Sequence, residues 1–182
     1  MRLPGMSRLA TREDAYVTDG PGGRLGELYV RHAAEATRLA YLLTGDRQLA
    51  EDLVQDAFVK LAGRLVHLRD PGAFDAYLRR TIVNLANSHF RRKQVERTYL
   101  SRTAAEPPVF GEAPDTGRRD ELWKGLQRLP IRQRTAIVLR VYEDLPEDRV
   151  ADILGCRPGT VRSLVSRGLA ELRVHVRSDD DG

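Results

Sequence analysis

The polar residues best suited to chemistry in this sequence lie near its end, in the stretch GTVRSLVSRGLAELR at residues 159–173. Its apolar residues recur at intervals of three and four, which predicts one continuous apolar stripe along a helix. The polar residues on the other face or at the start of this helix are Arg157, Thr160, Arg162, Ser163, Ser166 and Arg167. Guanidinium and hydroxyl groups can donate hydrogen bonds to phosphates and to base edges, so this face is a candidate nucleic-acid surface.

A polar outer face on a helical hairpin is also common where nothing binds, so the stripe alone leaves a simple solvated face open. The preceding residues favour nucleic acid. The segment EDRVADILGCRPG predicts a short helix and a tight turn at Gly155, and Ala151 is small enough to let two helices approach closely. This is the helix-turn-helix layout, in which the second helix enters the major groove. From Arg157 to Arg177 there are five arginines and one acidic residue, Glu171.

A second basic stretch occurs in the middle of the chain, in the segment YLRRTIVNLANSHFRRK at residues 77–93. Its polar stripe at helical spacing, with the basic residues that end it, consists of Arg80, Asn84, Asn87, Arg91 and Arg92. Tyr77, Phe90 and Tyr99 could supply the stacking surfaces that single-stranded nucleic acid requires. A core position is the alternative for Tyr77 and Phe90, and the pattern leaves both readings open.

An acidic face lies on the helix predicted from residue 46 to residue 65. Asp52 and Asp56 lie on it with Gln55 beside them, and acidic residues outnumber basic ones over residues 46–56. Negative charge repels the phosphates of DNA and attracts a basic protein surface. We therefore expect this face to bind a protein.

The composition provides little for catalysis. Cys156 is the only cysteine, which excludes an internal disulfide and a thiolate metal cluster. The four histidines stand singly along the chain. We expect no metal, no cofactor and no enzyme active site. The opening residues lack the apolar run of a signal peptide, and no stretch has the length of a membrane span, so we expect a cytoplasmic protein.

The elements that position these residues are all predicted to be helices. Apolar residues recur at helical spacing from Leu25 to Leu43, with Asp46 as the N-cap of the next helix. No alternating strand pattern longer than four residues occurs, so the predicted fold is all-α with two small helical domains joined by a flexible linker. The expected organisation is an N-terminal disordered arm at 1–23, a helical domain at 24–100, a linker at 101–119, a helix-turn-helix domain at 120–176 and an acidic tail at 177–182.

Four segments in this order resemble bacterial RNA polymerase sigma factors of the extracytoplasmic-function group: DRQLAEDLVQDAFVKL, FDAYLRRTIVNLANSHFRR, LPIRQRTAIVLRVYEDL and VADILGCRPGTVRSLVSRGLAELR. The resemblance covers about residues 24 to 175. It implies a protein that binds core polymerase through the β′ clamp coiled coil and the β subunit, directs transcription initiation at promoters, and has an anti-sigma factor as a partner. It also implies that the polymerase performs the chemistry.

The resemblance assigns roles to individual positions. It implies that Asp52, Gln55, Asp56 and Val59 grip the β′ clamp coiled coil. It implies that Arg80, Asn84, Asn87, Arg91 and Arg92 engage the −10 promoter element and hold its opened strand, while the loop from His67 to Gly72 captures a flipped base. The linker would thread toward the polymerase active centre. The final helix, with Arg157, Thr160, Arg162, Ser163, Ser166 and Arg167, would read the −35 element.

The sequence departs from the family pattern at three positions. Tyr77 stands where tryptophan is usual, Ser88 occupies a common aspartate position, and Pro146 replaces a serine-type cap before the helix-turn-helix. These departures bear on strand opening and promoter choice. The alternative function is a free-standing helix-turn-helix regulator, which would bind a palindromic DNA site without polymerase.

Overall fold

The computed structural model describes residues 21–63, 71–100 and 117–180, and within these ranges the chain is helical with no strand. The predicted all-α class is therefore confirmed. The helices are α1 (Pro21–Thr44), α2 (Arg47–Ala62), α3 (Pro71–Leu100), α4 (Gly117–Arg128), α5 (Ile131–Ile137), the π-helical turn η2 (Val138–Tyr142), α6 (Glu147–Leu154) and α7 (Pro158–Asp180).

Four of the predicted segments fall partly outside the described residues. The parts outside are residues 1–20 of the arm, 67–70 of the loop from His67 to Gly72, 101–116 of the linker and 181–182 of the acidic tail. α1 begins at Pro21, α3 begins at Pro71, α4 begins at Gly117 and α7 ends at Asp180, so the described parts of these segments are helical. The domain boundaries given above remain a prediction.

The first helical unit consists of α1, α2 and α3, packed on one another. Asp46 is the N-cap of α2, as expected: its Oδ1 accepts a hydrogen bond from the backbone N–H of Leu49 at 3.0 Å. The apolar face of α2 is buried as its periodicity predicts. Phe58 lies at the centre of this unit, with its ring 4.9 Å from that of Tyr29 and 5.8 Å from that of Phe74.

The second unit consists of α4, α5, η2, α6 and α7. α6 ends at Gly155, which has the left-handed backbone conformation (φ 60°, ψ 44°) that turns the chain toward α7. Gly168 lies in the middle of α7 against α5, where an added Cβ would stand 2.6 Å from Cδ1 of Ile137. α5 and α7 can approach this closely because position 168 has no side chain.

The turn η2 continues α5 directly, without a break in the chain's helical course. Within η2 the helix widens, and it closes with the backbone N–H of Glu143 donating to the carbonyl of Val138 at 3.0 Å. Such wide turns rotate the following residues relative to a regular α-helix. Glu143 comes immediately after η2, and its contacts are described below.

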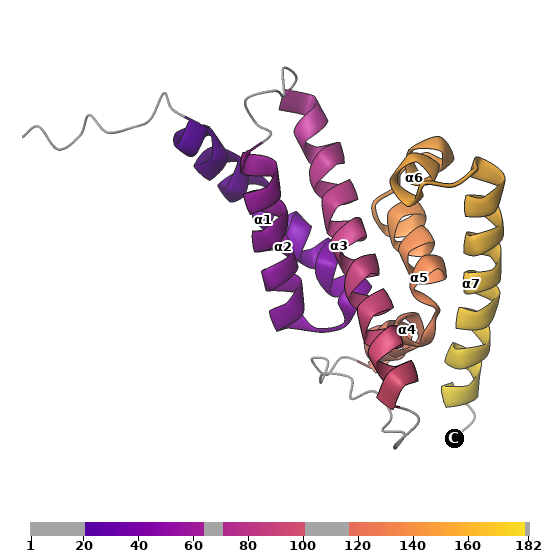
Figure 1. Ribbon diagram of the computed structural model, residues 1–182. Coiled ribbons are helices and arrows are strands. Elements are labelled where there is room, and N and C mark those ends of the chain that lie inside the picture. Colours follow the sequence, from indigo (N-terminus) through magenta and orange to yellow (C-terminus); the bar gives the residue numbers. More distant parts are fainter. Residues whose placement is uncertain (1–20, 64–70, 101–116, 181–182) are drawn as a thin grey trace, which may run out of the picture.

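The two units pack against each other. A single cluster of buried apolar side chains extends from Leu28 of α1 to Leu172 of α7. α3 contacts α5 and α6, and α1 contacts α4, α5 and η2. In Figure 1, α5 and α6 lie beside α3, and α7 forms the outer edge of the molecule.

Candidate functional site

The outer face of α7 has the arrangement that its spacing predicts. Val161, Leu164 and Leu172 are buried, and the four polar residues between them are exposed and line an open groove: Arg162, Ser163, Ser166 and Arg167. The side chain of Arg162 is 76% exposed, and its Nη2 donates to Oε1 of Glu147 at 3.0 Å. Nε of Arg167 donates to the carbonyl of Ser163 at 3.2 Å. Both guanidinium groups therefore lie on the surface, each with a local partner.

α6 and the turn after it position the start of this face. Pro146 is the N-cap of α6 and supplies no side-chain hydrogen bond, as expected for proline. Glu147 and Asp148 lie in the first turn, where negative charge stabilises the helix dipole. Arg157 and Thr160, beside the N-terminus of α7, are exposed.

The polar stripe of α3 is exposed except at one position. Arg80, Asn84, Arg91 and Arg92 are exposed. Asn87 is half-buried, and its Oδ1 is buried with no hydrogen-bond partner among the described residues. The structure thus brings together four of the five predicted residues on an open face, and Asn87 points partly inward.

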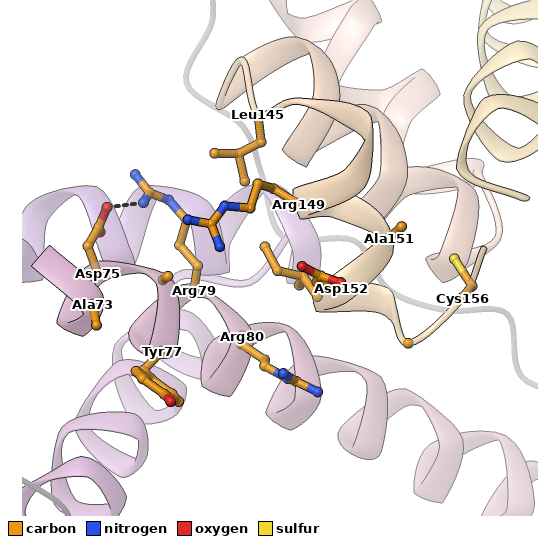
Figure 2. A pocket seen from close by; sticks show the side chains of 13 residues that line it. Ala73, Asp75, Tyr77, Arg79, Arg80, Leu145, Arg149, Ala151, Asp152 and Cys156 are labelled. Atoms are coloured by element: carbon orange, nitrogen blue, oxygen red, sulfur yellow. Dashed lines mark hydrogen bonds and ion pairs between the residues drawn. The ribbon is translucent and has the colours of Figure 1, made fainter. Parts of the chain in front are cut away.

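The aromatic residues of α3 differ in their surroundings. Tyr77 is 48% exposed and lines a cavity of about 700 Å³ between α3 and α6. Figure 2 shows this cavity, with Tyr77 and Arg80 on α3 and with Arg149 and Asp152 on α6. Phe90 is half-buried, and the guanidinium of Arg134 lies 5.6 Å from its ring centre. Phe90 therefore packs against the second unit, a third possibility that the sequence pattern did not suggest.

The acidic face of α2 is open to solvent. Asp52, Gln55, Asp56 and Val59 are all exposed, and Val59 reaches 74% exposure. Asp52 accepts a hydrogen bond from Nε2 of Gln48 at 3.2 Å on the same face. An apolar side chain among carboxylates suits a protein partner, because the valine can be buried while the carboxylates meet basic residues.

Two polar clusters between the units were missed from the sequence. Arg134 and Gln127 are buried, with 5% and 4% exposure. Arg79 of α3 is bonded to Glu143 of the second unit at 2.7 Å and also to Asp75 of its own helix. A signal existed for Arg134, which stands three and four residues before Ile137 and Val138 and so falls on an apolar helix face.

The charge of Arg79 is maintained by its partners. Burial lowers the pKa of this guanidinium, but the hydrogen bonds and negative charges of Glu143 and Asp75 outweigh burial and raise the pKa above its ordinary value. For Arg134, burial lowers the pKa to about 10. The buried Arg134 and the half-buried Arg79 therefore differ, because of these two only Arg79 has carboxylates beside it.

Known proteins resemble this chain in sequence and fold. Sigma-70 region 2 matches residues 28–96, and Sigma-70 region 4 matches residues 119–172. The RNA polymerase sigma-E factor of Streptomyces coelicolor is 33% identical over 155 residues, which cover 85% of this chain and 87% of that protein. The ECF RNA polymerase sigma factor SigE of Mycolicibacterium smegmatis is 34% identical over 153 residues, 81% of this chain and 59% of that protein.

A solved structure has the same fold. The sigma factor RpoE of Bartonella quintana, crystallised in complex with the anti-sigma factor NepR, has a TM-score of 0.70 and 24% identity over 86% of this chain and 98% of that chain. None of the described helices is both long enough and apolar enough to span a bilayer.

The two matched regions coincide with the two helical units and occur in the same order. Region 2 covers most of α1 to α3, and region 4 covers α4 to most of α7. From these matches and the identity to the Streptomyces protein, we conclude that the chain belongs to the extracytoplasmic-function group of RNA polymerase sigma factors, the subunits that bind core polymerase and direct transcription initiation at promoters.

Proposed function

We propose that three separate faces of this sigma factor each bind a different partner. The α2 face formed by Asp52, Gln55, Asp56 and Val59 docks on the β′ clamp coiled coil. The α3 face formed by Arg80, Asn84, Asn87, Arg91 and Arg92 engages the −10 element. The α7 face, with Arg157, Thr160, Arg162, Ser163, Ser166 and Arg167, reads the −35 element. The polymerase supplies the chemistry of RNA synthesis, and this chain supplies binding and position.

The observation that carries this division is the opposite charge of exposed faces on different helices. The carboxylates of Asp52 and Asp56 are exposed on α2, whereas the guanidinium groups of the two proposed DNA faces are exposed on α3 and α7. A carboxylate face on α2 repels phosphates, and the arginine faces attract them. One chain can therefore hold a basic protein surface and DNA at the same time.

The docking assignment is tested by reversing the charge of α2. Asp52→Lys combined with Asp56→Lys is expected to abolish co-purification with core polymerase, because four units of charge change where the partner is basic. Both residues are exposed, so circular dichroism should show unchanged helix content.

The matched control is Glu27→Lys combined with Glu96→Lys, which makes the same change at exposed positions on α1 and α3. This control is expected to retain polymerase binding. Loss of binding in both variants would attribute the effect to total charge, and retention in both would place the docking face elsewhere.

Two further assignments belong to this proposal. The Bartonella sigma factor is crystallised with an anti-sigma factor, which supports an anti-sigma partner for this chain as well. Because its polymerase partner acts in the cytoplasm, we assign the chain to that compartment. Co-purification from the native host with tagged protein, before and after envelope stress, would identify the anti-sigma partner or contradict its existence.

A further inference from the structure

The carboxyl end of α1 is capped by side chains from region 4. The last carbonyl groups of any α-helix lack partners within the helix. Here the carbonyl of Leu42 accepts from Nε2 of Gln127 at 3.1 Å, and the carbonyl of Leu43 accepts from Nη1 of Arg134 at 2.6 Å. A cation at this end of a helix also meets the negative pole of the helix dipole. Region 4 thus completes the hydrogen bonding of a region 2 helix.

This cap depends on close approach at Gly45. The residue has a φ of 73°, and an added Cβ would lie 2.6 Å from Oε1 of Gln127. The same Oε1 accepts a hydrogen bond from Nη1 of Arg134 at 2.6 Å. Trp123 of α4 stacks on Tyr41 with ring centres 5.8 Å apart. The end of α1 is therefore held against the second unit by both hydrogen bonds and aromatic stacking.

A second contact closes the other side of the interface. Glu143, which follows η2, reaches α3 and accepts from Nε of Arg79 at 2.7 Å; its side chain is 11% exposed. Beside it, the hydroxyl of Tyr142 accepts from Nη1 of Arg38 in α1 at 3.4 Å. The Arg79–Glu143 bond is the stronger of the two, because hydrogen bonds between charged groups are shorter and stronger than bonds with a neutral partner.

This closed arrangement is too compact for a promoter. The −10 and −35 elements have centres about 25 base pairs apart, which is about 85 Å of duplex at 3.4 Å per base pair. α3 packs on α5 and α5 packs on α7, so the axes of α3 and α7 are on the order of 20 Å apart at 8–10 Å per helix pair. The faces of α3 and α7 cannot both reach their elements in this conformation.

We propose that the contacts of Gln127 and Arg134 with the end of α1, together with the Arg79–Glu143 ion pair, form an interdomain latch that holds the free sigma factor closed and is released for promoter binding. This inference rests on the proposed roles of α3 and α7. The α2 face is exposed in the closed form. Core polymerase can therefore bind the closed protein first and open it afterwards.

The composition of the latch makes closure reversible. Arg134 donates hydrogen bonds to carbonyl and amide oxygens of Leu43, Gln127 and Leu129, and no carboxylate neutralises it among the described residues. Burying a charge without a counter-ion is costly. Every latch group can be hydrated when the domains separate, which lowers the free-energy cost of opening.

The latch is tested by resonance energy transfer between α1 and α7 in the full chain. Cysteines replace the exposed residues Ala34 and Ala170 for labelling, and Cys156→Ser removes the native thiol. High transfer is expected for the free protein, and a large loss of transfer is expected when core polymerase and promoter DNA are added. Glu143→Gln should raise the ratio of open to closed molecules about tenfold, the effect of losing one charge-assisted bond.

Asp144→Asn is the matched control, because it removes the same charge one residue away. Asp144 is exposed and pairs only weakly, with Arg140 of its own unit at 3.7 Å, and asparagine tolerates its positive φ of 48°. Transfer in this variant should equal that of the parent. Equal opening by both variants, or low transfer in the free parent protein, would overturn the latch.

Pull-down with core polymerase separates failure of the latch from failure of the proposed function. Glu143→Gln lies outside the three proposed binding faces and should retain polymerase binding. Polymerase binding and transcription without any change in transfer would refute the latch alone. Absence of polymerase binding by every variant, including the parent, would refute the proposed function.

Discussion

Arg162 has an acidic neighbour that competes with DNA for its guanidinium. The 3.0 Å bond to Glu147 holds the side chain above the start of α7 while the face is free. Because the pair is largely exposed, the bond itself contributes little to stability. The bond matters for DNA binding, because it already orients Arg162 along the surface and DNA has only a weak partner to displace.

Arg162→Ala is expected to weaken binding to −35 duplex by about 1–3 kcal/mol when measured with the polymerase holoenzyme, if the side chain makes a bidentate base contact. Arg173→Ala is the control, because Arg173 is an exposed arginine of the same helix outside the proposed set. If the footprint is retained in Arg162→Ala and lost in Arg173→Ala, the residues that read the −35 element lie closer to the end of α7.

Arg134→Lys is expected to make domain closure depend on pH. Lysine has an ordinary pKa of about 10.4, and burial without a carboxylate lowers the pKa of a cation. The buried state then binds fewer protons than the exposed state, so closure strengthens as the pH rises through the lowered pKa.

The parent protein should show no such change from this residue over the same range, because Arg134 stays protonated until the pH approaches its pKa of about 10. Energy transfer between the labels on α1 and α7, recorded from pH 7 to about pH 8.5, compares the two proteins while Arg134 of the parent stays protonated. Parallel curves would mean that position 134 is hydrated in the closed form.

At the scale of the elements, substitution of two glycines with positive φ distinguishes the cost of backbone strain from the cost of disturbed packing between the domains. Gly45→Ala is expected to cost more than Gly155→Ala in urea unfolding of the full chain. Both substitutions place alanine in the left-handed region, at roughly 1–2 kcal/mol. Only position 45 has a neighbour in the way, since nothing lies within 4 Å of a Cβ at position 155. Equal losses would show that Gln127 moves aside freely.

The helices and their exposed faces could be predicted from the sequence because local spacing determines them. The Asp46 cap, the buried stripe of α7 and the all-α class follow from residues within one or two turns of each other. The α2 face and most of the α3 stripe were predictable for the same reason. Asn87 was not, because its partial burial depends on the three-dimensional packing around α3.

The contacts between the two units could not be predicted in the same way. Arg79 and Glu143 are 64 residues apart, and Arg134 and Leu43 are 91 residues apart. Periodicity within a helix carries no information on a partner at that separation. The widening at η2 was also missed, because VLRVY is compatible with a regular helix.

At the scale of the whole molecule, the sigma factor and a free-standing regulator differ in what the isolated chain can bind. The isolated chain is expected to give no specific shift with promoter duplex, because its two DNA faces are held too close together. Adding core polymerase should produce protection at both elements. Tight, specific binding of a palindrome by the chain alone would favour the regulator.

The number of residues in the wide turn η2 determines whether Glu143 faces Arg79, and so whether the two units can close on each other. One residue more or less in a helix turns everything after it by about 100°. Shortening Val138–Tyr142 by a single residue would swing Glu143 away from Arg79 while leaving the DNA-reading helix intact. Related proteins that lack one residue at this point are therefore expected to have separated domains in the free state. Such a gap can be found by sequence comparison alone.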